Sequence, residues 1–286
     1  MQMIDWISEI ISNSFSKALD IVVDGFFDFI FKCINWVIIQ PTEPGKYITK
    51  FYEYLEGVQF FASGLLVIFV ILAVFRQISG VMYTSEKSMG TYFIHVTFAG
   101  GLIYILPKTV TLIFIPINNA LIGFIGDVGI DASRLKDSFL SARFLINQEG
   151  KILTIMFLIL IIALFAMAIA GAIRYIETLI AILIAPLVAI SVINNSDGLQ
   201  VWIREVIAIV FTQTIHFLIL QILLSIMAGV ESIIIMMILS IGCIAVGLKG
   251  PQILRQYLYR TGTSSAVVSA AGSTSRIGMM AMIFRH

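Results

Sequence analysis

Seven long stretches of this chain contain no charged residue, and each lies between two charged residues. The stretches are 17 to 25 residues long. A helix rises about 1.5 Å per residue, so roughly 20 residues cross the ~30 Å hydrocarbon core of a bilayer. The sequence therefore predicts a polytopic membrane protein. The stretches are 57–75, 88–107, 109–126, 152–173, 178–196, 206–230 and 232–248.

The composition excludes other classes for the whole chain. Hydrophobic residues make up 59% and charged residues 12%, against about half and about a quarter in a typical soluble domain. A soluble enzyme, a nucleic-acid-binding domain and a disulfide-stapled secreted protein are therefore excluded. We predict an all-α transmembrane helix bundle with about seven crossings. Five to seven are compatible with the sequence, because only Lys108 and the pair Arg174 and Glu177 separate some of the stretches.

Charge placement predicts three regions and an orientation. We expect an extracytoplasmic or interfacial region at 1–57, a transmembrane domain at 58–248, and a basic, partly flexible tail at 249–286. The tail holds five Lys and Arg and no acid, so the C-terminus should be cytoplasmic. Seven crossings then place the N-terminus outside, with twelve Lys and Arg inside and six outside.

Residues 4–39 form an amphipathic segment. Its charged residues recur at helical spacing on one stripe, and Ile and Phe occupy the remainder. We predict a helix lying in the membrane interface, with its apolar face in lipid or protein. Alternatively, Asp20, Asp24 and Asp28 contact an extracytoplasmic partner or line an aqueous passage, since three aspartates at successive i, i+4 steps repel one another.

Arg174 and Glu177 are candidate functional residues. Their spacing allows an ion pair on a helix, and ionisable groups at membrane depth are costly. The alternative is that they mark an ordinary turn at the membrane surface.

His216 lies near Gln213 in a stretch without a carboxylate, so we interpret both as polar groups satisfied between helices rather than as a proton relay.

Two proline sites predict bent helices. Pro186 follows Ala185 inside an apolar stretch, and Pro116 precedes Asn118 and Asn119, whose amides need partners. A bend can build a transport site, as in transporters with broken helices, or it can serve only to fit neighbouring helices.

No enzymatic or cofactor motif is present in the sequence. It lacks a phosphate-binding Gly-rich loop, HExxH, CxxC and a Gly-x-Ser-x-Gly elbow, and its apolar stretches hold no carboxylate pair. We therefore predict no catalytic residue, no cofactor and no metal ligand. Energy for any transport has to come from a partner.

Three segments of the second half resemble a known family. They are AIRYIETLIAILIAPLVAISV, GLQVWIREVIAIVFTQTIHFLI and GLKGPQILRQYLYRTG, within residues 150–262. The Ala-Pro in an apolar helix, followed by a Trp at the start of the next, carries most of the likeness. In this order the segments resemble the TrbL-type subunits of type IV secretion and conjugation systems. The chain lacks the large extracytoplasmic central domain of longer members.

The resemblance implies a non-enzymatic channel or scaffold in the bacterial cytoplasmic membrane. It implies a homo-oligomer, ring-forming in our reading, that works with other membrane subunits and cytoplasmic ATPases to pass DNA or protein. Carried over by position, the structural core is Arg174, Glu177, Pro186 and Trp202. The tail cations Lys249, Arg255, Arg260 and Arg276 then contact ATPases or DNA, or serve only to retain the tail inside.

Two functions of other classes remain as alternatives. One is a small-molecule transporter or channel, with its site at the proline-bent helices. The other is a membrane-lytic or lipid-handling protein.

Overall fold

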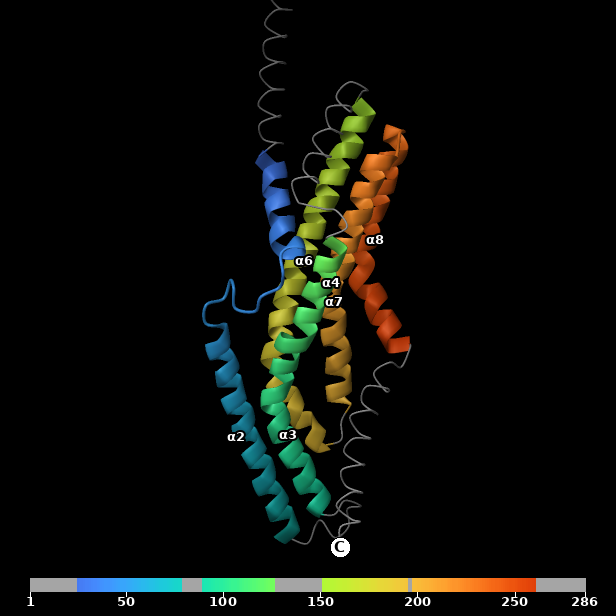
Figure 1. The fold of residues 1–286 in the computed structure, drawn as a ribbon. Coiled ribbons are helices and arrows are strands. Elements are labelled where there is room, and N and C mark those ends of the chain that lie inside the picture. The colour runs from blue at the N-terminus through green and yellow to red at the C-terminus, as the bar shows by residue number, and fades with distance from the viewer. Residues whose placement is uncertain (1–24, 79–88, 127–150, 195–196, 261–286) are drawn as a thin grey trace, which may run out of the picture. The chain divides into compact units, whose positions relative to one another are not determined.

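The computed structural model describes residues 25–78, 89–126, 151–194 and 197–260 (Figure 1). These residues are helical apart from short connections, and no strand occurs among them, which confirms the all-α prediction. Residues 25–34 are helical and continue into η1. The elements are η1 (Asn35–Ile39), α2 (Phe51–Ile78), α3 (Met89–Thr109), η3 (Val110–Phe114), α4 (Ile115–Gly126), α6 (Lys151–Ser191), η4 (Val192–Asn194), α7 (Gly198–Gly229) and α8 (Ile233–Arg260).

Five helical stretches in the described residues are long and apolar enough to span a membrane. Five is the lower end of the predicted range, because two pairs of charge-free stretches each form one continuous helix. A single charged residue does not break a helix, and the chain stays helical through Lys108 and through Arg174 and Glu177. The interpretation of Arg174 and Glu177 as a surface turn is therefore wrong. The spans are Phe51–Phe75, Gly90–Gly126, Ile155–Ser191, Gly198–Gly229 and Ile233–Gly250.

The smaller number of spans removes one argument for orientation. With five alternating crossings, eight Lys and Arg fall on the side of the N-terminus and six on the side of the C-terminus, while Lys108, Arg174, Arg204 and Lys249 lie within spans. The predicted excess of twelve Lys and Arg inside over six outside depended on treating Lys108, and Arg174 with Glu177, as loops between crossings. What still distinguishes the two sides is the tail, where cations occur without any acid.

The chain divides into two compact units. The first contains described residues from 25–41, 124–126, 151–172 and 216–248. The second contains described residues from 42–78, 89–123, 173–194, 197–215 and 249–260. Helices α6, α7 and α8 contribute residues to each unit.

In the first unit, the N-terminal helix packs on α6. The ring of Phe27 lies 5.5 Å from that of Phe157, and the ring of Phe26 lies 5.5 Å from that of Phe165. At Gly171 an added Cβ would lie 2.9 Å from side-chain carbons of the facing η1 residues, so only glycine permits this approach. The apolar face of the predicted amphipathic helix thus packs on protein in residues 25–39. Its buried residues are Phe27, Ile30, Phe31, Ile34 and Ile38.

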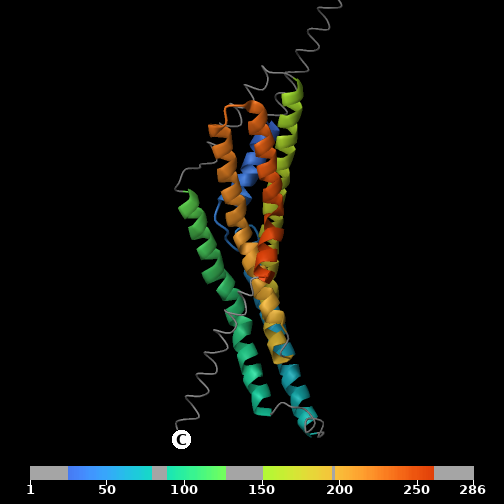
Figure 2. The ribbon, with the colours of Figure 1, turned by 90° about the vertical axis from the view of Figure 1, so that its right-hand side faces the viewer.

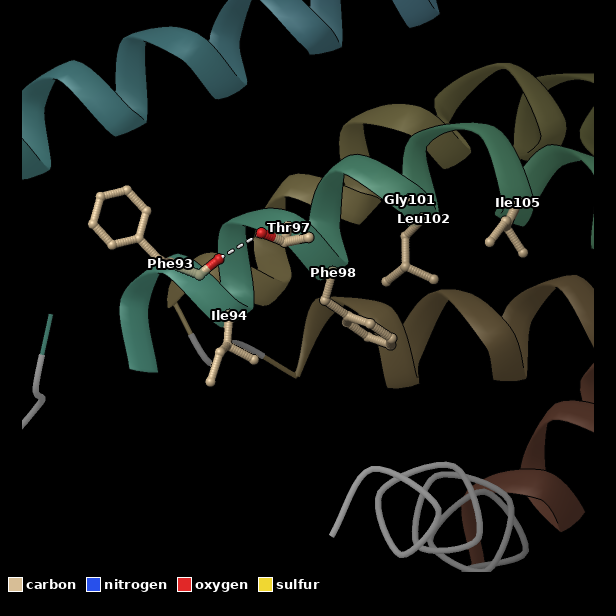
Figure 3. Close-up of a pocket in the computed structure, with 7 residues that line it drawn as sticks. All are labelled: Phe93, Ile94, Thr97, Phe98, Gly101, Leu102 and Ile105. Carbon is tan, nitrogen blue, oxygen red and sulfur yellow. Dashed lines mark hydrogen bonds between the residues drawn. The ribbon is translucent and has the colours of Figure 1, made fainter. Parts of the chain in front are cut away.

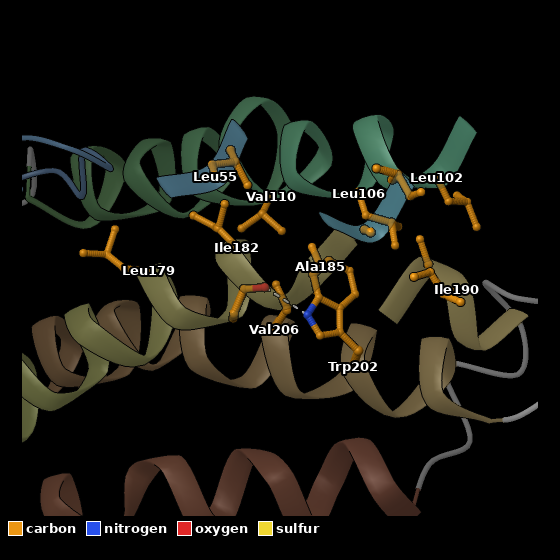
Figure 4. Packing of buried hydrophobic residues seen from close by; sticks show 14 of the residues in the cluster. Leu55, Leu102, Leu106, Val110, Leu179, Ile182, Ala185, Ile190, Trp202 and Val206 are labelled. Carbon is orange, nitrogen blue, oxygen red and sulfur yellow. Dashed lines mark hydrogen bonds between the residues drawn. The ribbon is translucent and has the colours of Figure 1, made fainter. Parts of the chain in front are cut away.

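In the second unit, α2 and α3 form an antiparallel pair and lie side by side in Figures 1 and 2. The hydroxyl of Tyr92 donates to the carbonyl oxygen of Phe69 at 2.9 Å. This pair packs with parts of α6 and α7 around a shared apolar core (Figure 4). Burial of these side chains holds the four helices together. The residues labelled there are Leu55, Leu102, Leu106, Val110, Leu179, Ile182, Ala185, Ile190, Trp202 and Val206.

A cysteine scan tests the continuity of α6. In a variant with Cys33 and Cys243 replaced by serine, Ile173→Cys should resist a membrane-impermeant maleimide applied from either side, because every segment of about 20 residues within the 37-residue apolar stretch contains position 173. Glu231→Cys is the matched control, since Glu231 is exposed between α7 and α8. Equal labelling of the two cysteines contradicts a continuous α6 and restores the surface turn.

Candidate functional site

A buried arginine lies near the middle of the long apolar helix α6. The Arg174 side chain is 3% exposed. Its apolar stretch, Ile155–Ser191, has 37 residues, whereas a span needs roughly 20. Every segment of about 20 residues within that stretch contains position 174. Wherever the bilayer lies along α6, Arg174 is therefore within its hydrocarbon core or at its edge, where an ionised group is costly unless it is well bonded.

The guanidinium of Arg174 bonds to two other segments of the second unit. Nη1 donates to Oε1 of Gln213 on α7 at 2.8 Å, and Nη2 donates to Oγ1 of Thr42 at 3.0 Å. Thr42 lies in the non-helical segment between η1 and α2. Gln213 is fully buried and Thr42 is 4% exposed. Arginine suits this position because its planar fork presents several donors in fixed directions.

Gln213 is the main acceptor of the site. Besides Arg174, its Oε1 accepts from the hydroxyl of Thr42 at 2.6 Å and from Nδ2 of Asn118 at 2.9 Å. Asn118, on α4, accepts in turn from the hydroxyl of Thr214 at 2.7 Å. Three donors thus direct their hydrogens at one amide oxygen. We refer to Thr42, Asn118, Asn119, Arg174, Gln213 and Thr214 together as the buried polar cluster.

Asn119 satisfies the backbone of the non-helical segment. Its Oδ1 accepts from the backbone N–H of Thr42 at 3.1 Å, and its Nδ2 donates to the carbonyl oxygen of Thr42 at 3.2 Å. Irregular backbone is tolerated at membrane depth only where protein or water satisfies its polar groups. The predicted need of the two asparagine amides for partners is therefore met inside the second unit.

Two prolines shape the backbone next to the buried polar cluster. Pro41 and Pro116 each follow a π-helical turn by two positions, after Ile39 and Phe114. In both cases the N–H of the residue before the proline donates to the carbonyl five residues earlier. A proline has no N–H, so the helical ladder cannot continue through it unchanged. Thr42 follows Pro41, and the two asparagines begin two residues after Pro116.

Trp202 lies in the apolar core rather than in the buried polar cluster, as does Ala185, the residue before the buried Pro186 (Figure 4). The indole Nε1–H of Trp202 donates to the carbonyl oxygen of Ala181 at 3.1 Å. Pro186 lacks the N–H that ordinarily bonds to the carbonyl of Ile182, the next residue of α6. The tryptophan therefore joins α7 to α6 at the turn that the proline weakens. Ala185 and Trp202, from the two features of the sequence that carry the family likeness, thus belong to one apolar core.

Comparison with known families assigns the chain to a protein family. The sequence matches the family described as conjugal transfer protein TrbL over residues 7–285, nearly the whole chain. The chain belongs to the TrbL family. No curated protein and no solved structure gives a significant match. The chain is accordingly a multi-pass membrane component of a conjugal transfer, or type IV secretion, system.

The predicted core residues of this TrbL protein lie in different surroundings. Arg174 is in the buried polar cluster, and Glu177 lies half-buried one turn further along α6. Pro186 is buried, and Trp202 is part of the apolar core. The two proline sites therefore do not line one common site, since Pro116 adjoins the polar cluster and Pro186 the apolar core.

The tail cations are placed only in part. Lys249 is exposed on α8. Arg255 forms an ion pair with Glu205 of α7, with 2.9 Å between Nε and Oε2. Arg260 is the last residue of α8, and Arg276 lies outside the described residues.

Among the three aspartates, Asp20 and Asp24 lie outside the described residues, and Asp28 is exposed on the N-terminal helix of the first unit. His216 is fully buried on α7 in the same unit. Within the described part of the chain, no group of three or more His, Cys, Asp or Glu side chains is arranged to hold a metal ion.

Sequence reasoning missed Thr42 and Thr214. The two prolines and the glycine of residues 40–45 indicate a break in the helix, but a threonine between two prolines, flanked by apolar helices, is also a polar group that needs partners. Thr42 bonds to residues 77 and more positions away. No spacing rule within one helix finds such a contact.

Replacing Gln213 with leucine tests the buried polar cluster. Gln213→Leu removes the acceptor of three buried donors, each costing about 1 kcal/mol or more when unsatisfied. We expect a stability loss of roughly 3 kcal/mol, seen as a lower unfolding temperature in mild detergent. The control is Gln252→Leu on α8, where the side chain is exposed. Equal stability of the two variants would show that the cluster contributes little.

A second variant tests the contact of Trp202 with α6. Trp202→Phe keeps an aromatic ring and loses the hydrogen bond to Ala181, so we expect a loss of about 1 kcal/mol from that bond in the same unfolding measurement. Trp36→Phe is the control, because Trp36 is 56% exposed. The assignment fails if both substitutions shift the unfolding temperature equally.

Proposed function

We propose that this TrbL protein is a homo-oligomeric scaffold or conduit in the cytoplasmic membrane, driven by ATPase partners during conjugal transfer. The observation that carries the proposal is the family match over residues 7–285. In this proposal the chain performs no catalysis and holds no cofactor. Its contribution is a rigid set of membrane helices on which other subunits assemble and past which DNA or protein moves.

The length of the apolar helices supports assembly with other protein. The stretch Ile155–Ser191 has 37 residues, about 55 Å at 1.5 Å per residue. Fitting it into a ~30 Å core requires a tilt near 60°, whereas membrane helices tilt about 20° on average and up to about 40°. Large apolar side chains are exposed from Ile155 to Leu187. Part of this surface therefore lies beyond the lipid tails, and further subunits are its natural cover.

The buried polar cluster supports the scaffold role. It joins the segment before α2 to α4, α6 and α7 through hydrogen bonds that converge on Gln213. A network that is well satisfied makes a packed interior more rigid and specifies one arrangement. A rigid interior suits a part on which other subunits assemble.

We propose a cytoplasmic C-terminus and an extracytoplasmic N-terminus, with an interfacial region at 1–57, the membrane domain at 58–248 and the tail at 249–286. The support is the tail itself, where five cations occur without an acid. Within it, Arg255 fixes α8 to α7 through Glu205. The remaining cations Lys249, Arg260 and Arg276 contact an ATPase or DNA phosphates. Asp20, Asp24 and Asp28 face an extracytoplasmic partner.

Charge reversal in the tail tests the proposed contact. We expect Lys249→Glu, Arg260→Glu and Arg276→Glu together to lower conjugal transfer on the order of tenfold, since each reversal replaces attraction to phosphate or carboxylate groups by repulsion. The readout is transfer frequency in cells that lack the native chain and carry the variant. The matched control reverses the exposed Lys32 and Lys50.

Membrane abundance and a C-terminal reporter fusion are measured in the same strains. Unaltered transfer by the tail variant contradicts the contact, and a reporter active only outside the cell contradicts the orientation. Normal transfer in cells without the chain would contradict its role in conjugation altogether.

A further inference from the structure

Helix α3 carries an apolar groove along one face in the second unit (Figure 3). The groove has a volume of about 530 Å³, and all of its lining residues in the described part of the chain belong to α3. Gly101 leaves a gap between larger side chains, and a Cβ added there would meet nothing within 4 Å. The lining residues are Phe93, Ile94, Thr97, Phe98, Gly101, Leu102 and Ile105.

A lysine continues the groove at one end. Positions 94, 98, 101, 105 and 108 follow one another at steps of three or four residues, so they share one face of the helix. Lys108 is exposed at the end of this row. Among the described residues it forms no ion pair. The apolar groove on α3 therefore leads to a single cation, Lys108.

The pairing of α2 with α3 places the carboxylate of Glu56 near the same height along the helix axes as Lys108. Ser63 Oγ lies 3.4 Å from Tyr104 Oη, which fixes the antiparallel register of the two helices. One turn further, a second cavity of about 170 Å³ opens between them. Glu56 and Lys108 both line this cavity, yet no ion pair joins them. The other lining residues are Tyr52, Leu55, Gln59, Pro107 and Thr111.

The cavity lies where the apolar parts of both helices end. The charge-free stretches 57–75 and 88–107 stop at Glu56 and at Lys108 respectively. The span Gly90–Gly126 is longer than the roughly 20 residues that cross a bilayer, so when its first part crosses the hydrocarbon core, Lys108 and the nearby Glu56 lie at the level of the lipid headgroups. The groove from Phe93 to Ile105 is then about 18 Å long, close to the ~15 Å of one leaflet's hydrocarbon.

We propose that α2 and α3 bind one phospholipid with a zwitterionic headgroup that carries a primary amine, of the phosphatidylethanolamine class. One acyl chain lies in the groove, and the phosphate meets the ammonium of Lys108. The headgroup ammonium donates to the carboxylate of Glu56, so the lipid bridges two charges that the protein leaves apart. Charge-assisted bonds of this kind are about twice as strong as neutral ones.

The two charges together select the headgroup. A choline headgroup carries a positive charge but no N–H to donate to Glu56. A glycerol headgroup carries no positive charge and places its anion near both Lys108 and Glu56. Only a headgroup with a phosphate and a primary ammonium complements both residues.

Native mass spectrometry of the full chain in mild detergent tests this site. The probe is an equimolar mixture of phosphatidylethanolamine, phosphatidylcholine and phosphatidylglycerol with identical acyl chains. We expect the protein to retain one phosphatidylethanolamine with about tenfold preference over the other two, the size of one charge-assisted hydrogen bond. Glu56→Gln should abolish the preference over phosphatidylcholine, and Lys108→Gln should weaken retention of all three lipids.

Matched controls and a blocked groove complete the test. Glu53→Gln and Lys50→Gln remove exposed charges outside both cavities and should leave retention unchanged. Gly101→Leu should fill the groove and abolish retention without unfolding, because the space around Gly101 is open. Equal retention of the three lipids by the unaltered chain overturns the proposal. So does a Gly101→Leu variant that still retains the lipid but loses a chain–chain complex, which would assign the groove to a second copy.

Discussion

The buried charge of Arg174 is the constraint on which the second unit depends. An ionised guanidinium among apolar helices is tolerated only when hydrogen-bond acceptors replace the water it has lost. Those acceptors come from α7 and from the segment before α2, and α4 supplies the amides that hold the acceptors in place. Segments far apart in the sequence therefore have to converge at one point. Apolar packing alone is non-directional and would not fix that arrangement.

Lys108 is a second cation in a long apolar helix, and its charge is accommodated in a different way. It too interrupts a long apolar helix, but its side chain is exposed beside a cavity instead of being enclosed by polar residues. The difference follows from the side chains. Arginine presents a fixed fork that several protein acceptors can satisfy, whereas the lysine ammonium is a strongly hydrated point charge on a flexible stem. One cation therefore organises the interior, and the other remains available to groups outside the chain.

The sequence predicts the helical membrane fold because burial in lipid depends on the composition of each stretch. It overestimates the crossings at Lys108 and at Arg174 and Glu177, because charge marks polarity and not the end of a helix. The asparagines after Pro116 could be identified as polar groups that need partners, and so could Arg174. Their partners could not be identified. Thr42 and Gln213 meet across 171 positions, a contact set by the packing of whole helices.

The backbone beside the buried polar cluster shows how such distant partners are aligned. A π turn precedes both Pro41 and Pro116, and each turn inserts one extra residue into the helical ladder. One extra residue rotates everything that follows by about 100° around the helix axis. The rotation changes which face carries Asn118 and Asn119. The π turn before Pro116 therefore shifts the register of α4, and the alignment of the asparagine amides with Gln213 and Thr42 depends on it.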